Sequence, residues 1–142
     1  MGGQNELQHS QDLRDSSMET GYITSHFKYS SLSCKCCNRI KIIPRLYTHM
    51  RLLEEVRNIV DFPIIINSGY RCPPHNIAVG GTKKSEHMEF ATDVRPEYGE
   101  NFTHQLSTLN KAAHDIGFNG IIEYPTFTHL DMRSGIYHNT VI

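Results

Sequence analysis

A helix pattern followed at once by a buried-strand pattern, in residues 44–67, constrains the fold of this chain more than any other feature. Apolar residues recur at helical spacing behind Pro44, a residue that suits the first turn of a helix: Leu46, Met50, Leu53, Val56 and Val60. The run 62–67 contains three consecutive isoleucines, as is typical of a buried strand. We therefore predict a helix over Pro44–Val60, with His49 on its surface, and a strand directly after it.

Two further patterns supply a second strand and a second helix. Residues 91–95 are predicted to form a strand. Apolar residues at helical spacing predict a helix over 102–116, with Asn101 as its N-terminal cap and Gly117 at its C-terminal stop. Both helices therefore carry an apolar face that needs a sheet to cover it.

The end of the chain completes the expected sheet. Residues 120–124 and 127–133 predict the two strands of a hairpin. This order of elements predicts an α+β fold with a mostly antiparallel sheet and two main helices. Residues 1–20 are polar and without an apolar period, so we predict a disordered N-terminal lead-in before a single domain over 21–142.

The composition excludes several classes of function. A net charge of −1 over 142 residues argues against a general nucleic-acid or membrane-surface binder. No apolar run reaches the roughly 18 residues that span a bilayer. The first residues lack the basic and then apolar pattern of a signal peptide, so we expect synthesis in a cytoplasm without one. We expect a monomer that contacts neither nucleic acid nor membrane.

Metal-type ligands lie in two distant segments. His87 and Asp93 follow a glycine-rich loop, and Phe127, His129 and Asp131 alternate along a predicted strand. Side chains two apart on a strand share a face, so His129 and Asp131 point the same way. If that face meets the first segment, two imidazoles and one carboxylate leave a fourth position for water, as in catalytic zinc sites. We predict one catalytic zinc ion held by His87, Asp93 and His129.

Hydrolysis at such an ion also needs a general base and an anion-binding group. Asp131 is the first candidate base, and its alternative role is to orient the ring of a zinc-binding histidine. Glu123, on the preceding hairpin strand, is the rival candidate. Arg71 ends a predicted strand, where its guanidinium fork can bind a substrate carboxylate or a developing oxyanion.

An ordered set of motifs from about 34 to 133 resembles the zinc D-alanyl-D-alanine carboxypeptidases and endopeptidases of the M15 class, especially small phage and bacterial members. The motifs are Ser68-Gly69-Tyr70-Arg71, His75-Asn76, Val79-Gly80-Gly81, Ser85-x-His87, Ala91-x-Asp93 and Phe127-x-His129-x-Asp131. The resemblance implies the hedgehog and D-Ala-D-Ala peptidase fold, and hydrolysis of D-amino-acid-containing peptidoglycan stem peptides. It also implies that Arg71 and Ser85 bind the peptide terminus. With no signal peptide, the enzyme is expected to reach the cell wall after lysis or as a phage-associated protein.

The chain departs from the family in two places. Five residues separate His87 from Asp93, one fewer than the family usually has, and none is a glycine. A residue lost from the turn leaves Asp93 on its side, whereas one lost from the strand turns the carboxylate away. The usual acid or base position before the last zinc histidine holds no carboxylate, since Thr126 and Thr128 occupy it. Both departures favour a rival function, a zinc-bearing module that binds peptide or glycan without cutting it.

Four cysteines form a separate group: Cys34, Cys36, Cys37 and Cys72. They could form a small second metal site, a disulfide pair, or simply buried and free thiols. Closed thiolate zinc sites more often contain two separated Cys-x-x-Cys pairs, which this chain lacks. A thiol-based redox or metal protein centred on this group is a third candidate function.

Overall fold

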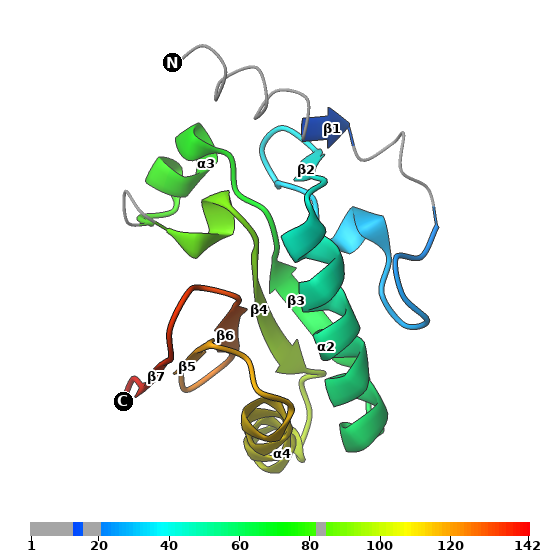
Figure 1. Ribbon diagram of the computed structural model, residues 1–142. Helices are drawn as coiled ribbons and strands as arrows, with labels where there is room; N and C mark the ends of the chain where they lie inside the picture. Colours follow the sequence, from blue (N-terminus) through cyan, green and yellow to red (C-terminus); the bar gives the residue numbers. More distant parts are fainter. Residues whose placement is uncertain (1–12, 16–20, 82–84) are drawn as a thin grey trace.

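The computed structural model describes residues 13–15, 21–81 and 85–142. Of the predicted lead-in, residues 1–12 and 16–20 lie outside the described residues, while Leu13–Asp15 form strand β1. The remaining elements, drawn in Figure 1, are η2 (Tyr29–Ser31), β2 (Arg39–Lys41), α2 (Pro44–Val60), β3 (Ile64–Ser68), α3 (Pro73–Ala78), η3 (Glu86–Met88), β4 (Ala91–Pro96), α4 (Phe102–Ile116), β5 (Gly120–Glu123), β6 (Thr128–Asp131) and β7 (Tyr137–Thr140).

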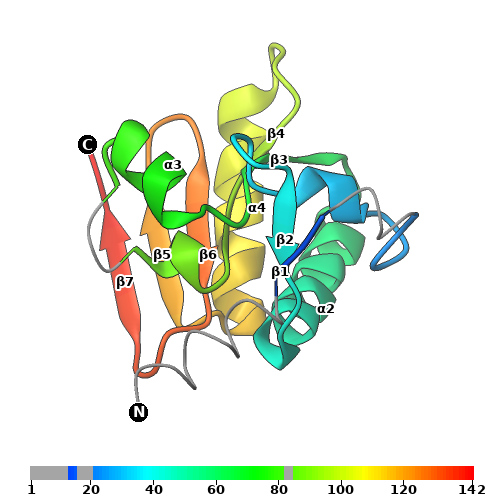
Figure 2. The same ribbon diagram turned by 90° about the horizontal axis from the view of Figure 1, so that it is seen from above.

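Five strands form the main sheet, in the order β3-β4-β6-β5-β7, and β1 pairs separately with β2. Neighbouring strands from β3 to β5 are antiparallel, and only β5 and β7 are parallel. The predicted α+β fold with a mostly antiparallel sheet is therefore confirmed. Strand β7, which lies beside β5 in Figure 2, was not predicted, because all four of its residues are exposed and show no alternation.

The two long helices begin and end where their apolar periods predict. Gly117 follows α4 in the left-handed conformation, with φ of 99°, which a glycine adopts without strain. Asn101 occupies the predicted N-cap position of α4, but its side chain accepts no capping hydrogen bond from the residues the structure describes. Its backbone is not extended, with φ of −94° and ψ of 6°, whereas a capping residue normally is.

The two faces of the sheet have different roles. Alternate residues such as Val94, Ile121 and Leu130 are fully buried in the core cluster that contains α2 and α4 residues. The residues between them, such as Asp93 and His129, therefore project from the opposite face. Figure 1 shows α3 on that opposite side, away from α2. The sheet thus separates the apolar core from the polar site.

His49 is buried in that core, so its predicted surface position is wrong. Its ring packs edge-on against Phe90 and Phe118, with centroids 4.9 and 5.1 Å away, and its Nε2 lies 2.9 Å from the hydroxyl of Thr92. Position 49 adjoins Met50 and widens the apolar stripe of α2, so helix rotation carries it into the interior. Burial lowers the pKa of His49 to about 3, which keeps the ring neutral.

Candidate metal centre

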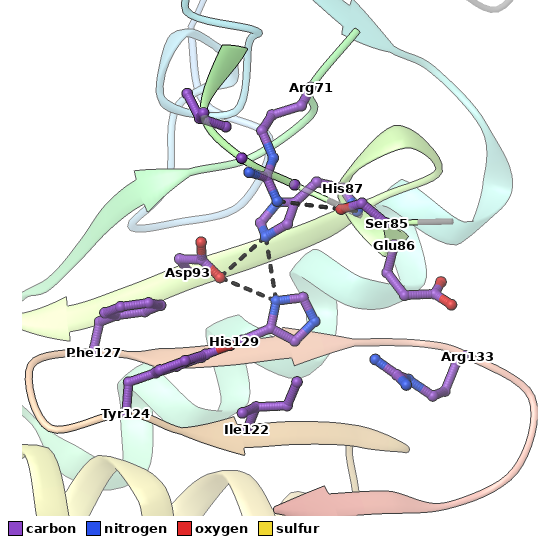
Figure 3. A pocket seen from close by; sticks show the side chains of 13 residues that line it. Arg71, Ser85, Glu86, His87, Asp93, Ile122, Tyr124, Phe127, His129 and Arg133 are labelled. Carbon is purple, nitrogen blue, oxygen red and sulfur yellow. Dashed lines mark hydrogen bonds and ion pairs between the residues drawn. The ribbon is translucent and has the colours of Figure 1, made fainter. Parts of the chain in front are cut away.

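Three elements bring the predicted ligands together. Asp93 on β4 and His129 on β6 are cross-strand partners, so their side chains leave the same face of the sheet. His87 comes from η3, whose first turn is capped by Ser85 Oγ accepting a hydrogen bond of 3.2 Å from the His87 amide. The Nδ1 of His87 donates to the Gly69 carbonyl at 2.8 Å. This bond fixes the ring and leaves Nε2 facing the other two ligands (Figure 3).

The three donor atoms form a nearly equilateral triangle. His87 Nε2 and His129 Nδ1 each lie 3.1 Å from Asp93 Oδ1, and they lie 3.2 Å from one another. For bonds of about 2.0 Å, the ligand atoms of a tetrahedral zinc site are about 3.3 Å apart. The triangle therefore fits one face of such a tetrahedron, and its nitrogen and oxygen donors are those that zinc prefers.

The shortened spacing between His87 and Asp93 leaves the carboxylate on its side. Helix η3 ends at Met88 and β4 begins at Ala91, so the shorter connection falls before the strand. Within β4 the register with β6 is regular, and Asp93 faces His129. Burial raises the pKa of Asp93, but hydrogen bonds from His129 and His87 outweigh it and hold that pKa at about 2.

Asp131 lies behind His129 and away from the open side of the site. Its Oδ2 accepts a hydrogen bond of 2.7 Å from His129 Nε2, which leaves Nδ1 of that ring for a metal. Arg133 binds the same carboxylate through its backbone amide, at 3.0 Å, and through its guanidinium, at 2.5–3.1 Å. Of the two roles predicted for Asp131, this fully buried geometry fits orientation of His129 and not proton transfer to a substrate.

The protonation of His129 follows from its two carboxylate partners. Burial lowers the pKa of this imidazole, but the hydrogen bonds to Asp131 and Asp93 outweigh burial and raise it to about 9. Hydrogen bonds from Arg133 and His129 in turn hold the pKa of Asp131 well below its usual range, although burial alone would raise it. A metal cation at the triangle would take the place of the proton on His129 Nδ1.

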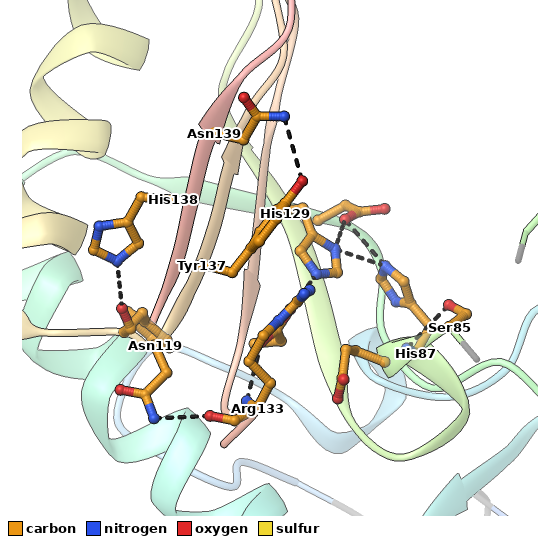
Figure 4. A network of polar contacts seen from close by, with 12 residues as sticks. Ser85, His87, Asn119, His129, Arg133, Tyr137, His138 and Asn139 are labelled. Carbon is orange, nitrogen blue, oxygen red and sulfur yellow. Dashed lines mark hydrogen bonds and ion pairs between the residues drawn. The ribbon is translucent and has the colours of Figure 1, made fainter. Parts of the chain in front are cut away.

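The site continues as a polar network into the last strand. Arg133 stacks over the ring of Tyr137, with 4.8 Å from the guanidinium carbon to the ring centroid, and its carbonyl accepts a hydrogen bond of 2.8 Å from Asn119 (Figure 4). Strand β7 thus supplies the aromatic face that covers Arg133. The position of Arg133, two residues past Asp131 and just beyond the end of β6, is the sequence signal that could have identified it.

Glu123 does not reach the metal centre, so its candidacy as general base is wrong. Its carboxylate accepts a hydrogen bond from Asn110 and pairs with His114, both at 3.0 Å, and both of those residues lie on α4. The neighbouring Ile122 lines the site instead. Adjacent residues of a strand face opposite sides, which places Glu123 under the helix.

A cavity of about 470 Å³ opens beside the three ligands. Both predicted substrate-binding residues line it, and the guanidinium of Arg71 donates to Ser85 Oγ at 3.2 Å. The Arg71 amide also donates to the His87 carbonyl at 2.9 Å, so Arg71 is fixed relative to the ligands. The sequence reasoning missed Glu86, which lines the cavity directly before His87.

The opposite wall of the cavity is aromatic. Tyr124 and Phe127 stack with their centroids 4.5 Å apart and their planes at 13°, at the turn between β5 and β6. Figure 3 shows both rings on the side of the cavity away from Arg133. The guanidinium of Arg71 beside Ser85 and the aromatic wall together suit a small ligand that carries a carboxylate and an aliphatic part.

A family model described as Peptidase M15 matches residues 25–131, which include the three ligands, Arg71 and Ser85. No curated protein matches the chain. Within the described part of the chain, every helix is too short or too polar to cross a membrane. M15 peptidases depend on zinc, and the chain holds candidate metal-binding residues at the expected place. Because the match covers well over half of the sequence, the chain belongs to the M15 peptidase family.

Proposed function

We propose that the protein is a zinc metallopeptidase that hydrolyses D-amino-acid-containing stem peptides of peptidoglycan. Membership of the M15 family supports the metallopeptidase activity. The observation that carries the proposal is the triangle of donor atoms on His87, Asp93 and His129, with sides of 3.1–3.2 Å, at the wall of a cavity that also contains Arg71. Three protein ligands beside an open cavity are typical of catalytic zinc sites and not of structural ones.

His87, Asp93 and His129 would hold one zinc ion. When bound, zinc acts as a Lewis acid toward a carbonyl and lowers the pKa of a coordinated water toward about 7. Asp131 accepts a hydrogen bond from the Nε2–H of His129, which would leave the Nδ1 lone pair of that ring directed at the ion. The carbonyl of Gly69 has the same role for His87.

Arg71 is proposed to bind the carboxylate of the peptide terminus. Its side chain is positioned by Ser85 and its backbone by His87, so little conformational freedom is lost when substrate binds. A planar guanidinium binds a carboxylate through two parallel hydrogen bonds, which also fixes the orientation of the scissile bond. Ser85 offers a hydroxyl to the same end of the substrate.

Glu86 is proposed as the group that takes the proton from the attacking water. Among the described residues that line the cavity, Glu86 and Asp93 carry the carboxylates, and Asp93 is assigned to the ion. The carboxylate of Glu86 pairs with the guanidinium of Arg45 at 3.8 Å, a long and partly exposed contact that is expected to hold it only weakly. Asp131 is not proposed for this role, because hydrogen bonds with Arg133 and His129 already occupy its oxygens.

The test measures zinc content and release of D-alanine from a synthetic stem pentapeptide. We expect the wild type to release D-alanine and His129→Ala to release none. Glu86→Gln should lose turnover while it keeps its zinc, whereas Glu123→Gln, on the far face of the sheet, should match the wild type. Full turnover in His129→Ala would overturn the proposal.

The second candidate is a zinc-bearing module that binds peptide or glycan without cutting it. One observation favours it: Thr128, near the position where the family has its acid or base, is buried and its hydroxyl is engaged by Asn110. The test is whether the zinc-loaded protein cleaves stem peptides, both linear D,D-carboxypeptidase substrates and cross-linked endopeptidase substrates. Zinc bound at the triangle with no cleavage of either kind of substrate would establish the binding module in place of the enzyme.

A further inference from the structure

We propose that Cys34, Cys36, Cys37 and Cys72 bind a second zinc ion, which has a structural role and shares no ligand with the proposed peptidase site. One ligand atom from each of the four cysteines lies within 4.8 Å of all the others. No other described group of metal-type ligands has the composition of a closed thiolate site.

The sulfur separations fit the edges of a tetrahedron. Cys34 Sγ lies 3.8 Å from Cys36 Sγ and 3.5 Å from Cys72 Sγ, and the last two sulfurs are 3.2 Å apart. With zinc–sulfur bonds of about 2.3 Å, the sulfurs of a tetrahedral site are about 3.8 Å from one another. Small adjustments of exposed side chains would bring the fourth ligand, Cys37, to the same distance.

A disulfide explains the cluster less well. A sulfur–sulfur bond is about 2.05 Å long, and all four cysteines are free thiols in the structure. Cys36 lies close to both Cys34 and Cys72, so no pair is set apart from the others. A disulfide would use two of the four sulfurs, whereas one tetrahedral ion uses all of them.

The backbone holds the first three cysteines in a closed turn. The Cys34 amide donates to the Arg39 carbonyl at 2.7 Å, and the Asn38 amide donates to the Cys34 carbonyl at 2.8 Å. Asn38 closes this turn in the left-handed conformation, with φ of 57°. The Cys72 amide also points at Cys34 Sγ, 3.4 Å away, where it would stabilise a thiolate.

The proposed ion would join two segments that are distant in sequence. The turn with three of the cysteines lies between η2 and β2, and Cys72 precedes α3, directly after Arg71. Next to it, the Tyr70 amide donates to the Leu32 carbonyl at 2.9 Å. A zinc ion here would hold the segment that follows β3 against the cysteine-containing turn between η2 and β2. It would thereby help to position Arg71 at the wall of the peptidase cavity.

Zinc is the expected ion because four protein thiolates leave no open position for water or substrate. All-thiolate tetrahedral ligation selects zinc or iron among the common metals. Cys36 and Cys37 are exposed, so an ion can enter from solvent, while Cys34 is only 1% exposed and anchors the site. The sequence offered a second metal site at these cysteines as one of several alternatives, but it did not show that Cys72, which follows α2 and β3 in the chain, reaches the other three.

The test counts metal in protein purified under reducing conditions with zinc and then dialysed. We expect about two zinc ions per chain in the wild type and about one in either a Cys36→Ser, Cys72→Ser double variant or a His87→Ala, His129→Ala double variant. Lys35→Ala is the matched control, because Lys35 is an exposed residue of the same turn that cannot bind zinc, and it should keep both ions.

Cobalt substitution tests the ligands without any cysteine variant. We expect near-ultraviolet sulfur-to-cobalt charge transfer in the wild type, in Lys35→Ala, and undiminished in the His87→Ala, His129→Ala variant. Absence of this band, iron in place of zinc at the cysteines, or a disulfide among them in mass spectrometry of the native protein would overturn the proposal. Because the band does not depend on peptide hydrolysis, failure of the peptidase assay would leave this result unaffected.

Discussion

Replacement of Asp131 by asparagine tests how the buried carboxylate serves the metal centre. Asp131 accepts a short hydrogen bond of 2.7 Å from His129 Nε2 and is fully buried. The amide of Asp131→Asn would satisfy Arg133 with its oxygen and turn its N–H₂ toward His129. The ring would then carry its proton on Nδ1, the atom assigned to zinc.

The expected loss of zinc affinity is about 10- to 100-fold, the usual cost of removing the partner of a metal-binding histidine, or about 1.4–2.7 kcal/mol. We expect the upper half of this range, because the bond to His129 is short, charged and buried. Competition with a chelator of known affinity measures the change, and circular dichroism verifies that the variant is folded.

Glu123→Gln is the matched control, since it neutralises a carboxylate on the neighbouring strand that faces α4. Its zinc affinity should equal that of the wild type. If Asp131→Asn binds zinc as tightly as the wild type and loses only turnover, then Asp131 is the general base and does not act by orienting His129. An equal loss of affinity in both variants would also refute the orienting role.

Three further changes test the fold and the support of the site. His49→Gln removes a group that stays neutral in the folded protein but takes a proton below about pH 6.5 when the chain is unfolded. Between pH 7 and pH 5, the free energy of unfolding should therefore fall by about 2 kcal/mol less in the variant than in the wild type. Urea titrations that give both proteins the same dependence of unfolding free energy on pH would contradict this. Gly69→Ala would drive a Cβ into the backbone after η2, 2.5 Å from a carbonyl oxygen, and should cost about 1–3 kcal/mol in chemical denaturation, whereas Gly99→Ala, in open space, should be neutral. Gly120→Ala would place a methyl group against the Asp131 carboxylate and should weaken zinc binding without loss of any polar group, as measured by the same chelator competition; unchanged affinity would show that the carboxylate can move.

Local periodicity was enough to predict four of the five strands of the main sheet and the two long helices that cover it. The apolar stripes of α2 and α4 and the strands β3 to β6 are properties of consecutive residues, and each was identified within a few residues. Alternation along β6 also placed His129 and Asp131 on one face. The order of the motifs, more than any single one, indicated the M15 family before the family match did.

The tertiary structure decided which side chains meet. The role assigned to Asp131 changed from candidate base to partner of His129, because its carboxylate is buried and its oxygens are hydrogen-bonded to Arg133 and His129. Glu123 faces α4, and Glu86 lines the cavity in its place. All four residues of strand β7 are exposed, and the strand forms because it pairs with β5.

The sequence by itself therefore determined the α+β class, the boundaries of the two long helices and the types of metal ligand in this chain. The convergence of His87 with His129, and of Cys72 with Cys34, depends on contacts between segments about 40 residues apart. The spacing of apolar residues indicates only which side of a helix or strand is buried. The meeting point of two such segments is set by sheet register and by packing across the core, which are long-range properties that a local pattern does not contain.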